Sequence, residues 1–248
     1  MNKLPAWRLA RHAYLDVVGN AQGLLQVGGL WLLLSWALMM LGRTSPVLGV
    51  AADVVVAVGA AAIAVAWHRH ILENEPLTAR MAPVDGRVAR YFAFTVILAF
   101  VVGLLPLAVL LLTTREAGEL RELGLESLLV PALMLACIYV AMRLQLVFPA
   151  TAIGDQGLTP ARSWAITEGN GWRLVMGFFL ATMPVALVVL GVALGLSWVA
   201  DVTGSIALAA LADLAAVGNA WLQAPLIASF LSYAYIFFTR QSSGLLAQ

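Results

Sequence analysis

The residue types that could bind a metal gather in one short segment, His68-Arg69-His70, with Glu73 and Glu75 close behind it. Imidazoles and carboxylates are common zinc ligands, and two histidines four positions apart on a helix can share one ion. Here the histidines are two positions apart, so on a helix their side chains point about 200° away from each other. We therefore expect no metal and no cofactor. The arginine instead predicts a basic collar that attracts anionic lipid headgroups.

Two ionisable residues, Asp53 and Arg143, lie within long apolar runs. A charged side chain at the centre of a bilayer costs at least about 2.5 kcal/mol, so such residues are candidate sites. Asp53 either pairs near the headgroups or within the fold, or binds a proton or cation in a cavity. Arg143 either reaches the interface along its aliphatic stem or holds a lipid phosphate or an internal carboxylate. The candidate contacts for lipid or substrate are Arg143, Asp53, Arg69, Arg87 and Arg90.

Nucleophilic catalysis needs a serine, threonine or cysteine held beside a base. The segment 149–173 is the richest in polar side chains and contains Ser163, but no Gly-x-Ser-x-Gly motif occurs and no histidine follows the segment. Asp155 and Glu168 have no spacing that would bring two carboxylates together for acid–base chemistry. We expect no catalytic residues, and we interpret the protein as non-enzymatic.

The elements that must position these residues are six long apolar runs. They cover about residues 23–41, 47–67, 91–113, 127–148, 173–200 and 219–239. A hydrocarbon core of about 30 Å needs roughly twenty helical residues, and the backbone amides within it must be paired internally. The sequence therefore predicts an all-α integral membrane protein, a single domain over residues 1–248 that forms a bundle of six transmembrane helices.

Composition and charge agree with this class. Hydrophobic residues make up 62% of the chain and charged residues 11%, against roughly 25% charged in soluble domains. No basic patch accompanies the net charge of +1, so we expect no nucleic-acid partner. If the N-terminus is cytoplasmic, eleven of the 14 Lys and Arg residues lie on that side, and the three others are Arg43, Arg115 and Arg121. This bias predicts a multi-pass protein of the bacterial inner (plasma) membrane with both termini cytoplasmic.

A Gly-Asn pair stands just before three of the six runs. The pairs are Gly19-Asn20, Gly169-Asn170 and Gly218-Asn219. We interpret each glycine as the end of one helix and each asparagine as the N-cap of the next. Tyr14 and Trp164 stand at the same distance before the first two pairs, which predicts amphipathic interfacial helices before spans one and five. A Thr-Pro pair at 159–160 is a start signal for the second of them. An internal duplication stays open.

The segment 205–217 is apolar but contains Asp213. It predicts a surface or re-entrant helix that leads into span six, with the upper part of one very long span as the alternative. Pro106, Pro184 and Pro225 lie inside spans three, five and six and predict kinks or local unwinding.

Small residues mark two further surfaces. Span two is rich in alanine between positions 51 and 66, and span five carries glycines at 191 and 195. Because small side chains let helix backbones approach each other closely, each surface predicts a contact face, within the bundle or between protomers.

Two segments resemble a known family. Tyr14-Leu-Asp-Val-Val-Gly-Asn20 is similar to the start of the YciC-like bacterial inner-membrane proteins, a group without an assigned function. The loop between spans four and five in that group is similar to these residues: Arg143 through Pro149-Ala150, Asp155-x-Gly157, Ser163-Trp164 and Gly169-Asn170. The same loop resembles the membrane domain that precedes some glycerophosphodiester phosphodiesterases, whose catalytic domain this sequence lacks. The resemblance implies the six-span layout and carries over no activity or metal site.

We therefore expect a non-enzymatic inner-membrane protein, an accessory or envelope-maintenance factor that acts through lipid or membrane-protein contacts. The alternative is a transporter or flippase-like carrier of a lipid or small amphiphile, which would use Asp53, Arg143 and the proline breaks. The expected partners are anionic lipid headgroups at the cytoplasmic face and another membrane protein.

Overall fold

The computed structural model describes residues 3–78, 81–104, 106–108, 111 and 126–242. Within these residues the regular secondary structure is helical and no strand occurs. Six helices are long and apolar enough to cross a membrane. The prediction of an all-α chain with six potential spans is thereby confirmed. The predicted end of span three at residue 113, and Arg80, Arg115 and Arg121 of the charge count, lie outside the described residues.

The first three helices are α1 (Ala6–Gly19), α2 (Ala21–Gly42) and α3 (Pro46–Glu73). The turn between α2 and α3 ends at Ser45, which is extended (φ −154°, ψ 125°) and directly precedes the proline that opens α3. Proline is favourable at the first helical position, because the N–H it lacks would have no intrahelical partner there. α3 ends where Asn74 takes the left-handed conformation, with φ 57°.

The next segment has a capped start and a π-helical end. α4 (Gly86–Ala99) begins after Asp85, whose side chain accepts hydrogen bonds from two backbone N–H groups of the first turn. It continues directly into η1 (Phe100–Leu104), a π-helix. Pro106 follows, and a proline can neither bond to nor fit against the carbonyl four residues earlier, which here belongs to η1. The local unwinding predicted at this proline is confirmed.

The next three helices are α7 (Glu126–Leu144), α8 (Val147–Ile153) and α9 (Pro160–Ile166). α8 ends at Gly154, which has a φ of 77°. The Thr159 hydroxyl accepts a hydrogen bond from the backbone N–H three residues on, and a proline is the first residue of α9. The predicted start signal for this helix is therefore confirmed.

The chain closes with two very long helices, α10 (Gly171–Thr203) and α11 (Ile206–Ser242), joined at Gly204 with a φ of 65°. The predicted separate helix before span six is wrong, because α11 is continuous from its first residue through that segment. The carboxylate that suggested a surface helix is instead paired within the fold. Asp213 lies 2.7 Å from the guanidinium of Arg43, just after α2.

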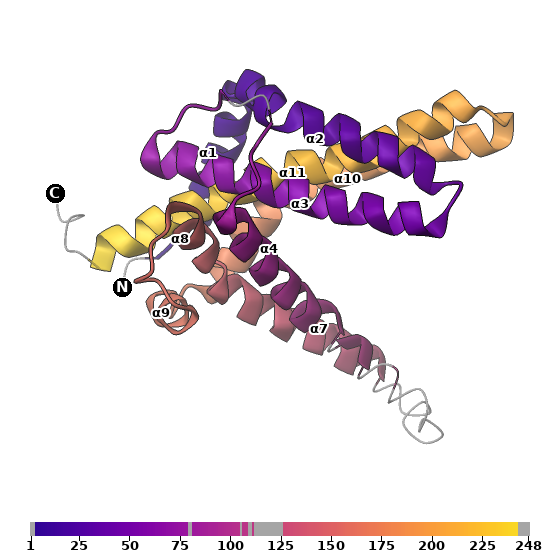
Figure 1. The fold of residues 1–248 in the computed structure, drawn as a ribbon. Helices are drawn as coiled ribbons and strands as arrows, with labels where there is room; N and C mark the ends of the chain where they lie inside the picture. The colour runs from indigo at the N-terminus through magenta and orange to yellow at the C-terminus, as the bar shows by residue number, and fades with distance from the viewer. Residues whose placement is uncertain (1–2, 79–80, 105, 109–110, 112–125, 243–248) are drawn as a thin grey trace.

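The helices form two arms that diverge from a common base (Figure 1). We call α2, α3, α10 and α11, which pack side by side, the larger arm, and α4, η1 and α7 the smaller arm. At the base, α8 contacts α3, α4 and α11, while α1 lies against α10 and α11. The turns α2–α3 and α10–α11 lie at the far end of the larger arm (Figure 1).

The core lies at the base, where the two arms meet. Fully buried side chains there include Trp67 of α3, Leu174 of α10 and Phe230 of α11. Farther along α10, large apolar side chains such as Val188 and Trp198 are exposed. An apolar face of this extent is unusual on a soluble monomer and normal on a helix that contacts lipid.

The asparagines of the Gly-Asn pairs do not cap helices as predicted. Neither Asn20 nor Asn170 makes a side-chain capping hydrogen bond, because their ψ angles of 27° and 4° are far from the extended geometry of an N-cap. The Asn20 amide instead donates backward, to the main-chain oxygen of Asp16 at 2.9 Å. Asn170 Oδ1 accepts a hydrogen bond from the buried backbone N–H of Leu4 at 2.8 Å.

The glycines of these pairs also differ from one another. Gly169 has a φ of 72°, as expected of a glycine that ends a helix, whereas Gly19 is the last residue of α1 and has no positive φ. Gly218 and Asn219 lie inside α11, so the predicted helix start at this pair is wrong. α1 and α9 do precede the first and fifth predicted spans. Their position at a membrane surface stays a prediction.

The glycines of α10 have two different environments. A Cβ atom at Gly177 would lie 2.6 Å from the ring of Phe230 in α11, so this glycine permits close contact of the two helices. Gly191 and Gly195, the predicted contact face, have no neighbouring atom within 4 Å of a Cβ atom. Among the described residues that face forms no close intramolecular contact, and contact between protomers stays a prediction.

Candidate functional site

A cavity of about 440 Å³ lies between the two arms. Its walls come from α3 and α11 of the larger arm and from α4, η1 and α7 of the smaller arm, with Phe148 of α8 and Phe178 of α10 between them. The lining is mostly apolar. Small-molecule sites typically enclose roughly 300–1,000 Å³ and are lined in the same way, with a few polar groups. This cavity is therefore the candidate site.

Alanines make room for the cavity on the side of α3. Ala57, Ala60, Ala61 and Ala64 line it, and their spacing places them on one face of the helix. Two further alanines, Ala220 and Ala224 of α11, complete this side. The small residues that predicted a close contact between helices thus form, at these positions, a cavity wall.

Four neutral polar side chains interrupt the apolar lining: Tyr91, Thr95, Gln145 and Gln223. The Thr95 hydroxyl donates to the main-chain oxygen of Tyr91 at 3.0 Å, which satisfies it within α4. The Gln223 amide donates to the main-chain oxygen of Thr182 at 3.0 Å. Among the described residues that line the cavity, none is charged. The wall therefore combines van der Waals surface with neutral hydrogen-bonding groups.

Behind the cavity wall, a buried histidine links three helices. His68 of α3 is completely buried, and its Nδ1 atom lies 2.7 Å from the Ser232 hydroxyl of α11. Its Nε2 atom lies 3.4 Å from the hydroxyl of Tyr91, which lines the cavity. Serine and histidine are the residue types of a nucleophile and its base. However, Ser232 is also fully buried and is not part of the wall, so the pair connects α3 and α11 behind the cavity.

A second polar contact fixes α1 to the same helices. Asp16 Oδ2 accepts hydrogen bonds from the Trp67 indole at 2.9 Å and from the Ser229 hydroxyl at 2.7 Å. Two donors compensate this partly buried carboxylate for the water it loses. Nearby, the Tyr14 hydroxyl donates to the main-chain oxygen of Leu180 at 3.2 Å, and burial raises the pKa of Tyr14 above its usual value. α1 is therefore an integral part of the base.

Arg143, a predicted lipid contact, lies away from the cavity wall. Its guanidinium stacks on the Trp164 ring, with 3.7 Å between Cζ and the ring centroid. The same group donates to the main-chain oxygen of Trp164 and to the Thr167 hydroxyl. With 7% of its surface exposed, Arg143 joins α7 to α9. A contact with lipid phosphate stays a prediction.

Asp53, the other predicted intramembrane site, is exposed on the outer surface of α3. It lies seven residues into the helix and is not among the residues that line the cavity. The structure therefore does not bring Asp53 and Arg143 together, and neither residue belongs to the candidate site.

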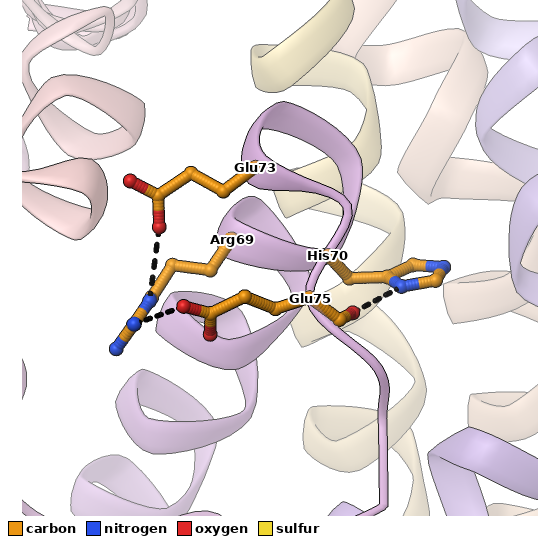
Figure 2. A network of polar contacts seen from close by, with 4 residues as sticks. All are labelled: Arg69, His70, Glu73 and Glu75. Atoms are coloured by element: carbon orange, nitrogen blue, oxygen red, sulfur yellow. Dashed lines mark hydrogen bonds and ion pairs between the residues drawn. The ribbon is translucent and has the colours of Figure 1, made fainter.

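Arg69 neutralises its charge locally (Figure 2). Its Nε atom lies 3.2 Å from Glu73, and its terminal nitrogen is hydrogen-bonded to Glu75. The Nδ1 atom of His70 lies 2.8 Å from the main-chain oxygen of Glu75, whereas His68 contacts Ser232. The two imidazole rings therefore point in different directions, as the spacing predicted. Among the described residues no group of three or more His, Cys, Asp or Glu could hold a metal ion. This network fixes the turn that leaves α3.

The segment after that turn crosses back over α2. The backbone N–H of Ala82 donates to the main-chain oxygen of Val27 at 2.9 Å, and the Trp31 indole donates to the main-chain oxygen of Ala82 at 3.0 Å. The start of α4 is thereby held near α2 and α3. Arg87 and Arg90 lie in its first turns; Arg87 is partly exposed and Arg90 is exposed. Their contact with anionic headgroups stays a prediction.

No protein-family model, curated protein or solved structure matches this chain. The resemblance to YciC-like proteins accordingly stays an expectation.

The polar residues of the cavity were not among the predicted site residues. The predicted sites within the apolar runs were ionisable groups, whereas Gln145 and Gln223 are neutral amides. A usable signal was present, because Gln145 and Gln223 each interrupt a long apolar stretch. A buried amide costs free energy unless its polar atoms are hydrogen-bonded.

Proposed function

We propose that this chain is a multi-pass protein of the bacterial inner membrane that binds a lipid or small amphiphile without converting it chemically. The cavity between the two arms is the observation that carries the proposal. Its walls belong to helices that are long and apolar enough to lie in a bilayer. Because lipid tails are as apolar as the wall, shape and hydrogen bonding would have to select the ligand.

The placement of basic side chains supports an orientation with the base in the cytoplasm. Lys3, Arg8 and Arg11 are exposed on or just before α1, which lies at the base. Arg87 and Arg90 stand where α4 leaves it. Cytoplasmic loops are enriched in such residues, and anionic headgroups attract them. In the cell, the protein would serve as an accessory or envelope-maintenance factor that holds or presents a lipid.

A carrier is the second candidate function, favoured by the π-helix. Val102 of η1 lines the cavity, so the irregular part of the smaller arm borders the candidate site. Short π-helical segments interrupt regular helical hydrogen bonding and are frequent at functional sites. A hinge here would let the smaller arm move relative to the larger one and release a ligand.

Filling the cavity tests the binding function. Ala57→Phe on α3 and Ala99→Phe on α4 place a large side chain in the cavity from opposite arms, at positions that are exposed. Ala51→Phe lies on α3 outside the wall and is the matched control. Native mass spectrometry of gently extracted protein should find a bound lipid in the wild type and the control, and lose it in both cavity variants. Equal lipid in all four proteins would place the ligand elsewhere and refute the proposal.

Reconstituted vesicles distinguish the carrier from a protein that only holds its ligand. A carrier should move a fluorescent lipid between leaflets, and Ala57→Phe should abolish that movement while Ala51→Phe retains it. Binding without movement in the wild type would leave the accessory function and exclude the carrier.

A further inference from the structure

Asp53 stands on the same face of α3 as the alanines that line the cavity. It precedes Ala57, the first of them, by four residues, which is about one turn of the helix. Around the helix axis, at about 100° per residue, its direction lies between those of Ala57 and Ala60. Side chains tilt toward the N-terminus of their helix, here the far end of the larger arm (Figure 1). The carboxylate therefore lies at the outer margin of the cavity, just beyond its wall.

This carboxylate has no counter-charge within the part of the chain that the structure describes. Asp53 is exposed, and it forms no ion pair or side-chain hydrogen bond with a described residue. Asp213 differs, because it lies 2.7 Å from the guanidinium of Arg43. The neighbours of Asp53 on the surface of α3 are apolar: Val50 is 64% exposed and Val54 is 51% exposed. Asp53 is therefore an uncompensated charge on an apolar surface.

The position of Asp53 along α3 makes this charge costly in a membrane. Asp53 and Arg69 are sixteen residues apart, which corresponds to about 24 Å along the helix axis. A hydrocarbon core of about 30 Å that begins at Arg69 would then extend about 6 Å past Asp53. Ionisable groups within that layer usually pair with a partner, because an unpaired charge is poorly solvated there. A cation on a bound molecule would be such a partner.

The cavity determines what kind of molecule could bring this cation. Among the described residues that line it, none is charged, so a charged group of the ligand would have to lie beyond the wall. Asp53 lies about 16 Å along the axis from Ala64, the innermost alanine of the wall. An extended dodecyl chain has a similar length. A chain against the alanines, Phe148 and Phe178 would thus place its head group at Asp53.

We propose that the ligand of this cavity is an amphiphile with a positively charged amino group, whose chain fills the cavity and whose ammonium pairs with Asp53. This inference rests on the proposed function and adds the chemical class of the ligand and its direction in the cavity. A phosphate head group would be repelled by the carboxylate, and a hydroxyl group would leave the charge of Asp53 unpaired. Alkylamines and phosphatidylethanolamine both carry the required ammonium group.

Three probes with one dodecyl chain and different head groups test this class. Delipidated protein is titrated with dodecylamine, dodecanol or dodecyl phosphate, and binding is measured by native mass spectrometry. The amine is cationic at neutral pH, as a lysine side chain is. It should bind about tenfold more tightly than the alcohol, and the phosphate should bind most weakly.

A fourth probe distinguishes the two sources of the ammonium group. Lauroyl lysophosphatidylethanolamine carries it behind a phosphate, on a chain of the same length. Binding at least as tight as that of dodecylamine would identify an aminophospholipid as the ligand. Weaker binding would identify a simple cationic amphiphile.

An isosteric variant assigns the selectivity to Asp53. Asp53→Asn removes the charge and keeps the shape of the side chain. It should reduce the amine-to-alcohol affinity ratio to near one while the alcohol still binds, which also shows that the cavity has folded. Asp201→Asn is the matched control, because Asp201 is an exposed carboxylate of α10 that does not line the cavity, and it should retain the tenfold ratio.

The outcomes separate this inference from the function on which it rests. Equal binding of amine and alcohol to the wild type overturns the inference and leaves lipid binding intact, and so does a tenfold ratio that persists in Asp53→Asn. If no probe binds while the cavity-filling variants still lose their native lipid, the inference alone is overturned. If no probe binds and those variants keep their native lipid, the proposed function itself is refuted.

Discussion

Leu4 and Asn170 are joined by a buried hydrogen bond, although 166 positions separate them: the backbone N–H of Leu4 donates to Asn170 Oδ1 at 2.8 Å. Leu4 is completely buried, and Asn170 is 3% exposed. In the first turn of α10, Arg173 donates to the main-chain oxygen of Leu4 at 3.2 Å. Both main-chain groups of Leu4 are thus held by the start of α10, which fixes the segment before α1 to the base.

Asn170→Ala should destabilise the protein. The substitution leaves the Leu4 N–H buried without an acceptor, which costs about 1–3 kcal/mol. We expect a lower melting temperature in detergent. A chain that lacks residues 1–5 is the control, because it contains no Leu4 N–H to satisfy. In that shortened chain Asn170→Ala should cost less than half as much. An equal cost in both chains would show that Asn170 stabilises the fold through another contact.

Two glycine substitutions in α10 should have opposite effects. A Cβ atom at Gly177 would lie 2.6 Å from Phe230, so Gly177→Ala should force α10 and α11 apart and cost about 1–3 kcal/mol. Gly191 has open space around it, and Gly191→Ala should stabilise the helix by up to about 1 kcal/mol. Thermal unfolding in detergent measures both. If Gly191→Ala instead weakens association without lowering the melting temperature of the monomer, this glycine lies at a contact between protomers.

Arg143→Lys should loosen α9 although it preserves the charge. Lysine cannot stack its ammonium group on Trp164 as a flat guanidinium does, nor donate to two groups in a fixed geometry. We expect faster hydrogen exchange at residues 159–167, measured by mass spectrometry, and little change in α2. The control is Arg162→Lys, because Arg162 is exposed and its guanidinium donates to the main-chain oxygen of Gly157 in the neighbouring loop. Unchanged exchange at α9 would contradict the structural role of Arg143.

The proposed orientation makes a prediction for thiol labelling. Cys137, the single native cysteine, is buried, so Cys137→Ala provides a background without thiols. In that background Gln156→Cys, in the loop before α9, should react only with reagent on the cytoplasmic side. Thr44→Cys, in the α2–α3 turn, should react only from the opposite side. Both positions are exposed. Labelling of both from the same side would contradict the predicted topology.

Hydropathy predicted the positions of the first two potential spans well. A span must be helical and apolar, so the predicted spans at 23–41 and 47–67 fall within α2 and α3. Helix ends were less predictable, because a helix continues past the apolar run wherever nothing terminates it. α3 therefore extends through His68 to Glu73, and α11 includes the thirteen residues before the predicted start of span six.

The candidate site was less predictable because it depends on tertiary contacts. Its lining comes from helices that are distant in the sequence, and the alanines of α3 carry no mark that distinguishes a cavity wall from a close contact. The role of Asn170 was missed for the same reason, since its partner is the main chain of Leu4 and a main-chain donor leaves no side-chain pattern. In contrast, the diverging directions of His68 and His70 follow from local spacing and were predicted.

The lengths of the two last helices have a consequence for the surrounding bilayer. α10 has 33 residues and α11 has 37, which correspond to about 50 and 55 Å along their axes. A hydrocarbon core of about 30 Å cannot cover an apolar hairpin of this length, even at a tilt of about 40°. Val202 and Ile206, which are 70% and 77% exposed near its tip, would otherwise protrude into the aqueous phase. For a membrane-inserted protein we therefore expect the bilayer next to this hairpin to thicken and long-chain lipids to gather along one flank.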